Sequence, residues 1–102
     1  MKKEYFDIKI SVSFFREGKV FVAYSPALDI STSGKDFKEV KQRFDEVVQI
    51  FFDETLKRGT LDEALGELGW QKVKNNWEPP KVIAHETEII KVPSLGAAAC
   101  RN

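Results

Sequence analysis

The sequence has little of the chemistry on which catalytic and metal sites depend. It contains one cysteine, Cys100, and one histidine, His85, among 102 residues. A zinc site takes four ligands of the cysteine or histidine type, or three with a water, and this pair cannot supply them. A single cysteine forms no disulfide within the chain. No nucleophile and base are spaced to converge. We therefore expect no catalytic residue, no cofactor, no metal site and a protein that is not an enzyme.

Net charge and long apolar runs are also absent. The 16 basic residues balance the 16 acidic residues, so the formal net charge is zero. This balance disfavours nucleic-acid or membrane-surface binding that depends on bulk positive charge, and it removes the self-repulsion that keeps small proteins apart. No uninterrupted apolar run follows the basic N-terminus, as a signal peptide or membrane span requires. We expect a cytoplasmic protein with no membrane association and no direct DNA binding.

The remaining composition fits one small globular domain. Hydrophobic residues make up 42% of the chain and charged residues 31%, and a chain of this length can bury one core. Its eight phenylalanines exceed what a thin core needs, which leaves apolar side chains for an interface. We interpret residues 1–92 as a single domain and residues 93–102 as a flexible C-terminal tail.

The first third of the sequence predicts an antiparallel sheet. Apolar and polar residues alternate over residues 6–14, which indicates a strand with one buried face. A polar turn at residues 16–19, with Gly18 in a left-handed conformation, leads to a strand at 20–24 that is apolar on both faces. Pro26 ends that strand because proline has no N–H to donate. Residues 28–33 are a third candidate strand, which ends at Gly34.

A long helix is predicted over residues 37–58. Its apolar stripe recurs at three- and four-residue spacing and consists of Phe37, Val40, Phe44, Val47, Val48 and Phe51. Asp36 and Glu39 resemble a capping box, and Gly59 follows the last turn as a stop. Ile50 lies on the far side of the helix from the stripe, and Phe52 lies at its edge. Both are therefore surplus to this core.

The rest of the chain predicts a short helix and a final strand. A second capping box at residues 60–63 opens a helix that ends at Gly69, and Trp70 folds back onto the core. Residues 87–92 have the pattern of a strand, which Pro93 ends. The order β-β-β-α-(α)-β predicts an α+β fold in which an antiparallel sheet has the long helix packed on one face.

Four segments occur in an order typical of one protein family. Residues 21–29 read FVAYSPALD, residues 31–34 read STSG, residues 56–63 read LKRGTLDE and residues 68–70 read LGW. Their order and spacing resemble the motifs of the HicB-like antitoxin family over roughly residues 5–70. One detail differs, because residues 35–37 read KDF where this family usually has Asp-Thr.

The resemblance implies a partial RNase H-like β-β-β-α-β fold without nuclease function. Members of this family neutralise a small HicA-type toxin, an mRNA interferase, by covering its active surface, and they form dimers or tetramers. We therefore expect a non-enzymatic antitoxin or antitoxin-derived interaction module with a HicA-type toxin as its partner. We also expect a homodimer or higher homo-oligomer. Because no helix pair follows Trp70, the chain resembles a stand-alone domain without the C-terminal DNA-binding module of many HicB proteins.

Five apolar residues are the candidates for a protein interface. They are Phe21, Val22 and Tyr24 in the second strand, together with Ile50 and Phe52 on the long helix. An alternative stays open, in which an orphan domain of the same fold binds a small ligand or single-stranded RNA on its sheet. The sequence assigns no role to His85 or to the C-terminal tail.

Overall fold

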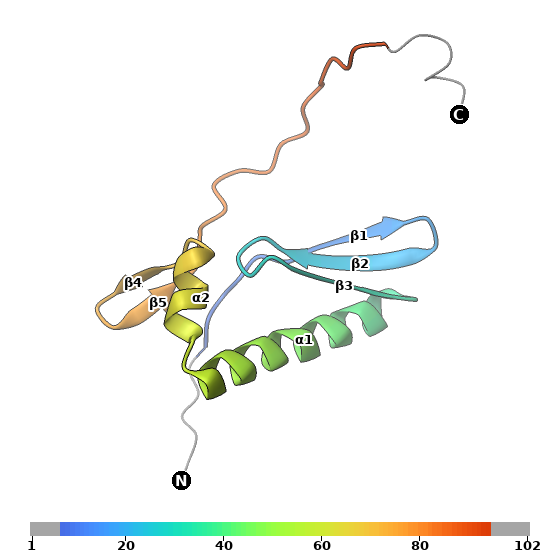
Figure 1. The fold of residues 1–102 in the computed structure, drawn as a ribbon. Coiled ribbons are helices and arrows are strands. Elements are labelled where there is room, and N and C mark those ends of the chain that lie inside the picture. The colour runs from blue at the N-terminus through green and yellow to red at the C-terminus, as the bar shows by residue number, and fades with distance from the viewer. Residues whose placement is uncertain (1–6, 95–102) are drawn as a thin grey trace.

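The computed structural model describes residues 7–94, and it is an α+β protein with a three-stranded antiparallel sheet and one long helix (Figure 1). The elements are β1 (Ser13–Glu17), β2 (Val20–Ser25), β3 (Ile30–Gly34), α1 (Phe37–Arg58), α2 (Leu61–Glu67), β4 (Gln71–Val73) and β5 (Asn76–Glu78). The sheet has the order β1-β2-β3, and β4 and β5 form a separate hairpin. α1 packs against β2 and β3 on one face of the sheet (Figure 1). The predicted α+β class and the antiparallel sheet with a long helix on one face are confirmed.

The predicted first strand begins later than expected. Ser13 pairs with Tyr24, so residues 11 and 12 would fall opposite Pro26 and Ser25, where β2 ends and proline offers no N–H. Residues 7–12 therefore pair with no strand, and the prediction of a strand over 6–14 is wrong for these positions. Residue 6 lies outside the described residues. The alternation itself is confirmed, because Ile8, Ile10 and Val12 pack against the core.

The turn between β1 and β2 forms as the sequence predicts. Gly18 is its first central residue and has a φ of 62°. A two-residue hairpin of the II′ type needs positive φ at this position, which glycine adopts without a steric penalty. The turn fixes the register that brings Phe15 opposite Val22.

The ends of α1 agree with the predicted signals. The Asp36 side chain accepts a hydrogen bond from the Glu39 N–H at 2.8 Å, and the Glu39 carboxylate accepts one from the Lys35 N–H at 2.8 Å. Gly59 ends the helix with a φ of 71°, and its N–H donates to the Leu56 carbonyl. These bonds satisfy backbone groups that a bare helix end leaves unpaired.

The predicted capping box of the second helix is wrong, although α2 forms. The Thr60 side chain makes no capping hydrogen bond, and its ψ is 11° rather than extended. The Thr60 N–H donates to the Thr55 carbonyl at 2.9 Å and so completes the end of α1. With this ψ, Thr60 lacks the extended backbone from which an N-cap side chain accepts a bond from the first turn of the helix.

The core consists of two adjoining clusters. Beneath the sheet, Ala23 of β2 packs with Val40 and Phe44 of α1. At the other end, the turn after β2 packs against α2, and the buried residues there are Ala27, Leu28, Leu65 and Trp70. The prediction that Trp70 returns to the core is confirmed, because only 4% of it is exposed.

The C-terminal part departs most from the sequence prediction. No strand forms at residues 87–92, since residues 79–94 contain no helix or strand. A hairpin that the sequence did not suggest forms instead from β4 and β5, with Lys74 and Asn75 at its turn in the positive-φ conformation. Residues 81–93, here named the arm, extend away from the body (Figure 1). The radius of gyration is therefore 18.2 Å, against about 13 Å for a compact chain of about 100 residues.

The placement of a domain boundary at residue 92 stays a prediction. Apart from Pro93 and Ser94, the predicted tail lies outside the described residues, and so does Cys100.

Candidate functional site: the outer face of the sheet

The strand register separates the sheet into two faces of different character. Side chains alternate along a strand, so Ala23, which is buried against α1, points away from its neighbours Val22 and Tyr24. Val22 pairs with Phe15 of β1 and with Ser33 of β3, and Tyr24 pairs with Ser31. We name the face formed by Phe15, Val22, Tyr24, Ser31 and Ser33 the outer sheet face. In Figure 1, no helix lies over this face of the sheet.

The outer sheet face forms an open depression of about 530 Å³. Its lining residues are Phe15, Glu17, Val22, Tyr24, Ser31, Thr32 and Ser33. The lining combines apolar carbon with hydroxyl groups, and its single charged side chain is acidic. Such a surface offers shape, apolar contact and neutral hydrogen bonds to a partner, and it offers no cation to a phosphate.

Tyr24 is fixed at one end of this depression. Its hydroxyl donates a hydrogen bond to Asp29 Oδ1 at 3.1 Å. This bond, with smaller effects of desolvation and of the negative charge of Asp29, raises the pKa of Tyr24 above its ordinary value. The tyrosine is therefore neutral, and it presents an aromatic ring and a hydroxyl group rather than a phenolate anion. Asp29 itself has a φ of 52°, a conformation that aspartate and asparagine tolerate better than most residues.

The structure brings together two of the five predicted interface residues. Val22 and Tyr24 share the outer sheet face, whereas Phe21 lies on the opposite face and packs near Val40. Ile50 is 60% exposed on α1, away from the sheet. Phe52 is half-buried and packs against the second core cluster. The five residues therefore do not form one surface.

Three residues of the outer sheet face were missing from the predicted interface, namely Phe15, Ser31 and Ser33. The signal for Phe15 was present in the sequence, because a two-residue turn at Gly18 places Phe15 opposite Val22. The predicted strand ended one residue too early to include it. The two serines could be assigned to this face only once the register of β3 was known.

The motif residues that carried the family resemblance support the fold. The Trp70 indole N–H donates to the Ala27 carbonyl at 2.7 Å, which joins the LGW segment to the segment at 21–29. Gly34 approaches α1 so closely that a Cβ there would lie 2.8 Å from the backbone nitrogen of Val40. These contacts explain why a glycine and a tryptophan suit these positions, and they involve no exposed site.

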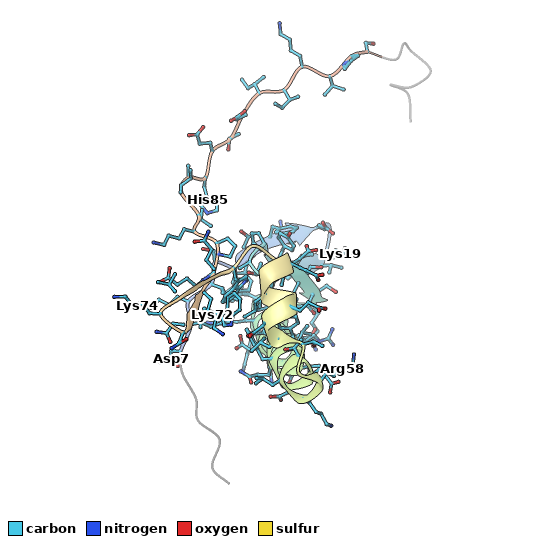
Figure 2. All side chains as sticks on the ribbon, turned by 60° about the vertical axis from the view of Figure 1, so that its left-hand side comes forward. Asp7, Lys19, Arg58, Lys72, Lys74 and His85 are labelled. Atoms are coloured by element: carbon cyan, nitrogen blue, oxygen red, sulfur yellow. The ribbon has the colours of Figure 1, made fainter. Side chains whose placement is uncertain are left out.

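The charged side chains are dispersed. On α1, Arg43 and Glu39 approach to 3.8 Å, and Arg58 and Glu54 approach to 3.5 Å, each pair one helical turn apart. Ion pairs of this kind on a helix surface contribute little to stability. Figure 2 shows Lys19, Arg58 and Lys72 on three separate parts of the molecule.

Metal-ligand side chains do not gather within residues 7–94, where no group of three or more His, Cys, Asp or Glu could hold an ion. His85 is exposed in the arm (Figure 2). No helix in the described part of the chain is long and apolar enough to cross a membrane.

Comparisons with known protein families, with curated proteins and with solved structures find no match to this chain.

Proposed function

We propose that this protein is a non-enzymatic interaction module of the HicB-like antitoxin type, which neutralises a small HicA-type mRNA interferase by direct binding. The proposal combines the motif order in residues 21–70 with the uncovered outer sheet face. The RNase H-like assignment of the sheet and helix belongs to the same proposal.

The uncovered outer sheet face is the observation that carries the proposal. Phe15 is 43% exposed there beside Val22 and Tyr24. Antiparallel sheets commonly leave one face to water, and that face is then usually polar. Apolar and aromatic side chains in the same place are typical of a surface that binds another protein. A toxin whose active surface is to be blocked needs a broad contact of this kind rather than a deep pocket.

The outer sheet face favours a protein over single-stranded RNA. Proteins that bind single strands combine stacking rings with a basic groove that follows the phosphates. The lining of this depression contains the rings of Phe15 and Tyr24, but its charged member is Glu17. The labelled cations Lys19 and Lys72 lie on separate parts of the molecule (Figure 2).

Co-expression with a HicA-type toxin tests this function. The growth of cells that express the toxin should be rescued by the wild-type protein, and the two proteins should co-purify. Val22→Lys places a charge at the centre of the outer sheet face and should abolish both effects. Val73→Lys is the matched control, because Val73 is also a solvent-accessible valine, 40% exposed, in the separate β4–β5 hairpin.

Each outcome of this experiment decides one part of the proposal. Failure of the wild type to rescue growth or to bind the toxin would reject the antitoxin function. Equal rescue by both variants would reject the outer sheet face as the contact surface. Circular dichroism of Val22→Lys must match the wild-type spectrum, so that a lost complex reports a lost contact. Retention on an RNA column that disappears in moderate salt would support the alternative RNA function.

A further inference from the structure

The strand β1 lies at an edge of the sheet that the described residues leave open. No strand pairs with its outer side, α1 packs against β2 and β3 instead, and all five residues of β1 are exposed. Phe14 of β1 contacts the ring of Phe37 at a centroid distance of 5.0 Å, and both rings remain at least one-third exposed. An exposed edge strand with aromatic side chains is a template for pairing with a further strand.

The open edge is longer than β1 itself. Residues 7–12 lead directly into β1 and pair with no strand. Their inward side chains Ile8, Ile10 and Val12 are already held against the core. The chain from residue 7 to residue 17 is therefore positioned by the body and offers its outer side to a partner strand.

The arm has the composition of a strand that lacks its sheet. Ile83 and Ile89 are each about 95% exposed, and Ile90 and Val92 are also well exposed. Residues 87–92 consist mainly of β-branched side chains, which fit a pleated sheet. Their exposure to water is unfavourable, so burial against a sheet would stabilise them. Figure 1 and Figure 2 both show this segment extending away from the body.

We propose that the arm of one copy of this chain pairs as a fourth strand beside β1 of a second copy, and that the second copy returns the same contact. Such reciprocal exchange closes a dimer with twofold symmetry. The occupant of the open edge is thus a second copy of the chain. This inference does not rest on the proposed function, because it requires no other protein.

Two prolines at the base of the arm favour exchange over folding back. Pro79 and Pro80 follow β5 directly, and the Pro80 ring lies against Gly69, where an added Cβ would be 3.7 Å from it. Residues before proline are restricted to extended conformations. Glu78 and Pro79 are therefore held in extended conformations, and the arm beyond them leads away from the body (Figure 1).

The size and charge of the two surfaces suit a dimer. The arm and residues 7–17 together comprise about 24 residues per copy, within the roughly 20–30 residues per side of a stable interface. Each segment carries as many acidic as basic residues, namely Asp7, Lys9, Arg16 and Glu17 in residues 7–17 and Lys81, Glu86, Glu88 and Lys91 in the arm. The net charge of each segment is therefore zero, so pairing them adds no net repulsion.

Sedimentation velocity of full-length variants tests the exchange. The wild type should sediment as a dimer. Ile90→Lys should raise the dimer dissociation constant roughly 100-fold, because each dimer loses two buried isoleucines. Ile90 is 70% exposed in the single chain, so this variant should keep the wild-type circular dichroism spectrum. Ile50→Lys is the matched control, since Ile50 is an exposed isoleucine on α1, and it should remain a dimer.

Cross-linking identifies which chain supplies the strand. In a Cys100→Ser background, one tagged copy carries Ser13→Cys and a differently tagged copy carries Ile89→Cys. A short bifunctional maleimide should join the two tags. The proposal is overturned by a monomeric wild type, by a dimer that Ile90→Lys leaves intact, or by a dimer that only Ile50→Lys dissociates. It is also overturned if the two tags are not joined, whereas a chain that carries both Ser13→Cys and Ile89→Cys cross-links within itself.

Discussion

Replacing Trp70 by phenylalanine should destabilise the protein far more than the same replacement of Trp77. The Trp70 indole is buried, and its N–H donates to the Ala27 carbonyl at 2.7 Å across 43 residues of sequence. Trp70→Phe removes the donor and leaves a buried acceptor unpaired, which costs about 1–3 kcal/mol. The missing part of the ring leaves a small cavity that costs roughly 1 kcal/mol more. We expect a total loss of about 2–4 kcal/mol.

Trp77 provides the matched control for this prediction. It is half-buried, and its indole N–H donates to Asp62 Oδ1 at 3.1 Å in an exposed position where water can replace it. We expect Trp77→Phe to cost about 0–1 kcal/mol, because exposed bonds of this kind contribute little to stability.

Urea and thermal unfolding followed by circular dichroism measure both tryptophan effects. A loss of 2–4 kcal/mol lowers the melting temperature by roughly 10 °C or more in a protein of this size. Equal destabilisation by the two variants would refute the reasoning, since it would mean that the Trp70–Ala27 bond is not a buried link between the two motif segments.

Two further predictions concern Gly34 and Tyr24. Gly34→Ala should destabilise the protein by about 1–3 kcal/mol in urea unfolding, because the new Cβ would lie 2.8 Å from the Val40 nitrogen. Gly66→Ala should instead stabilise the protein by about 0.5–1 kcal/mol, because Gly66 is a helix position with open space around it. A change of the same sign in both variants would contradict the close approach of Gly34 to α1. Hydrogen bonding to Asp29 raises the pKa of Tyr24, so its stabilising effect is present below about pH 10 and is lost as the pH rises through the raised value. The ultraviolet phenolate titration of Tyr24 is obtained by subtracting the curve of a Tyr24→Phe variant from that of its parent. This Tyr24 titration should lie at lower pH when the parent is Asp29→Asn than when it is the wild type, and an unchanged curve would count against this bond.

Local sequence signals predicted those parts of the fold that depend on near neighbours. The bounds of α1 follow from Asp36 and Gly59, which act within one helical turn. Gly18 likewise sets the β1–β2 turn. The signals failed where a second element decided the outcome. Thr60 has the sequence of a cap, yet its backbone is held by the end of α1.

The same limit applies to strands and to the candidate site. Whether an alternating segment forms a strand depends on what lies opposite it, and residues 7–12 find β2 already ended. Phe21 and Val22 are adjacent in sequence and both apolar, yet their side chains lie on opposite faces of the sheet. Alternation places the two residues on opposite faces, and the packing of α1 against Ala23, which shares a face with Phe21, decides which face is buried.

The surplus of phenylalanine that the composition indicates has a specific location. Phe44 serves the core, but Phe14, Phe15 and Phe37 are all exposed around the open side of β1. A general excess of apolar residues would be scattered over the surface, and single exposed residues need no explanation. Phe14 and Phe37 instead contact each other at 5.0 Å beside the open edge, Phe15 lies on the adjoining outer sheet face, and the isoleucines of the arm are exposed to water. In the proposed exchange, the rings at the open edge and the isoleucines of the arm would form one contact between two copies of the chain.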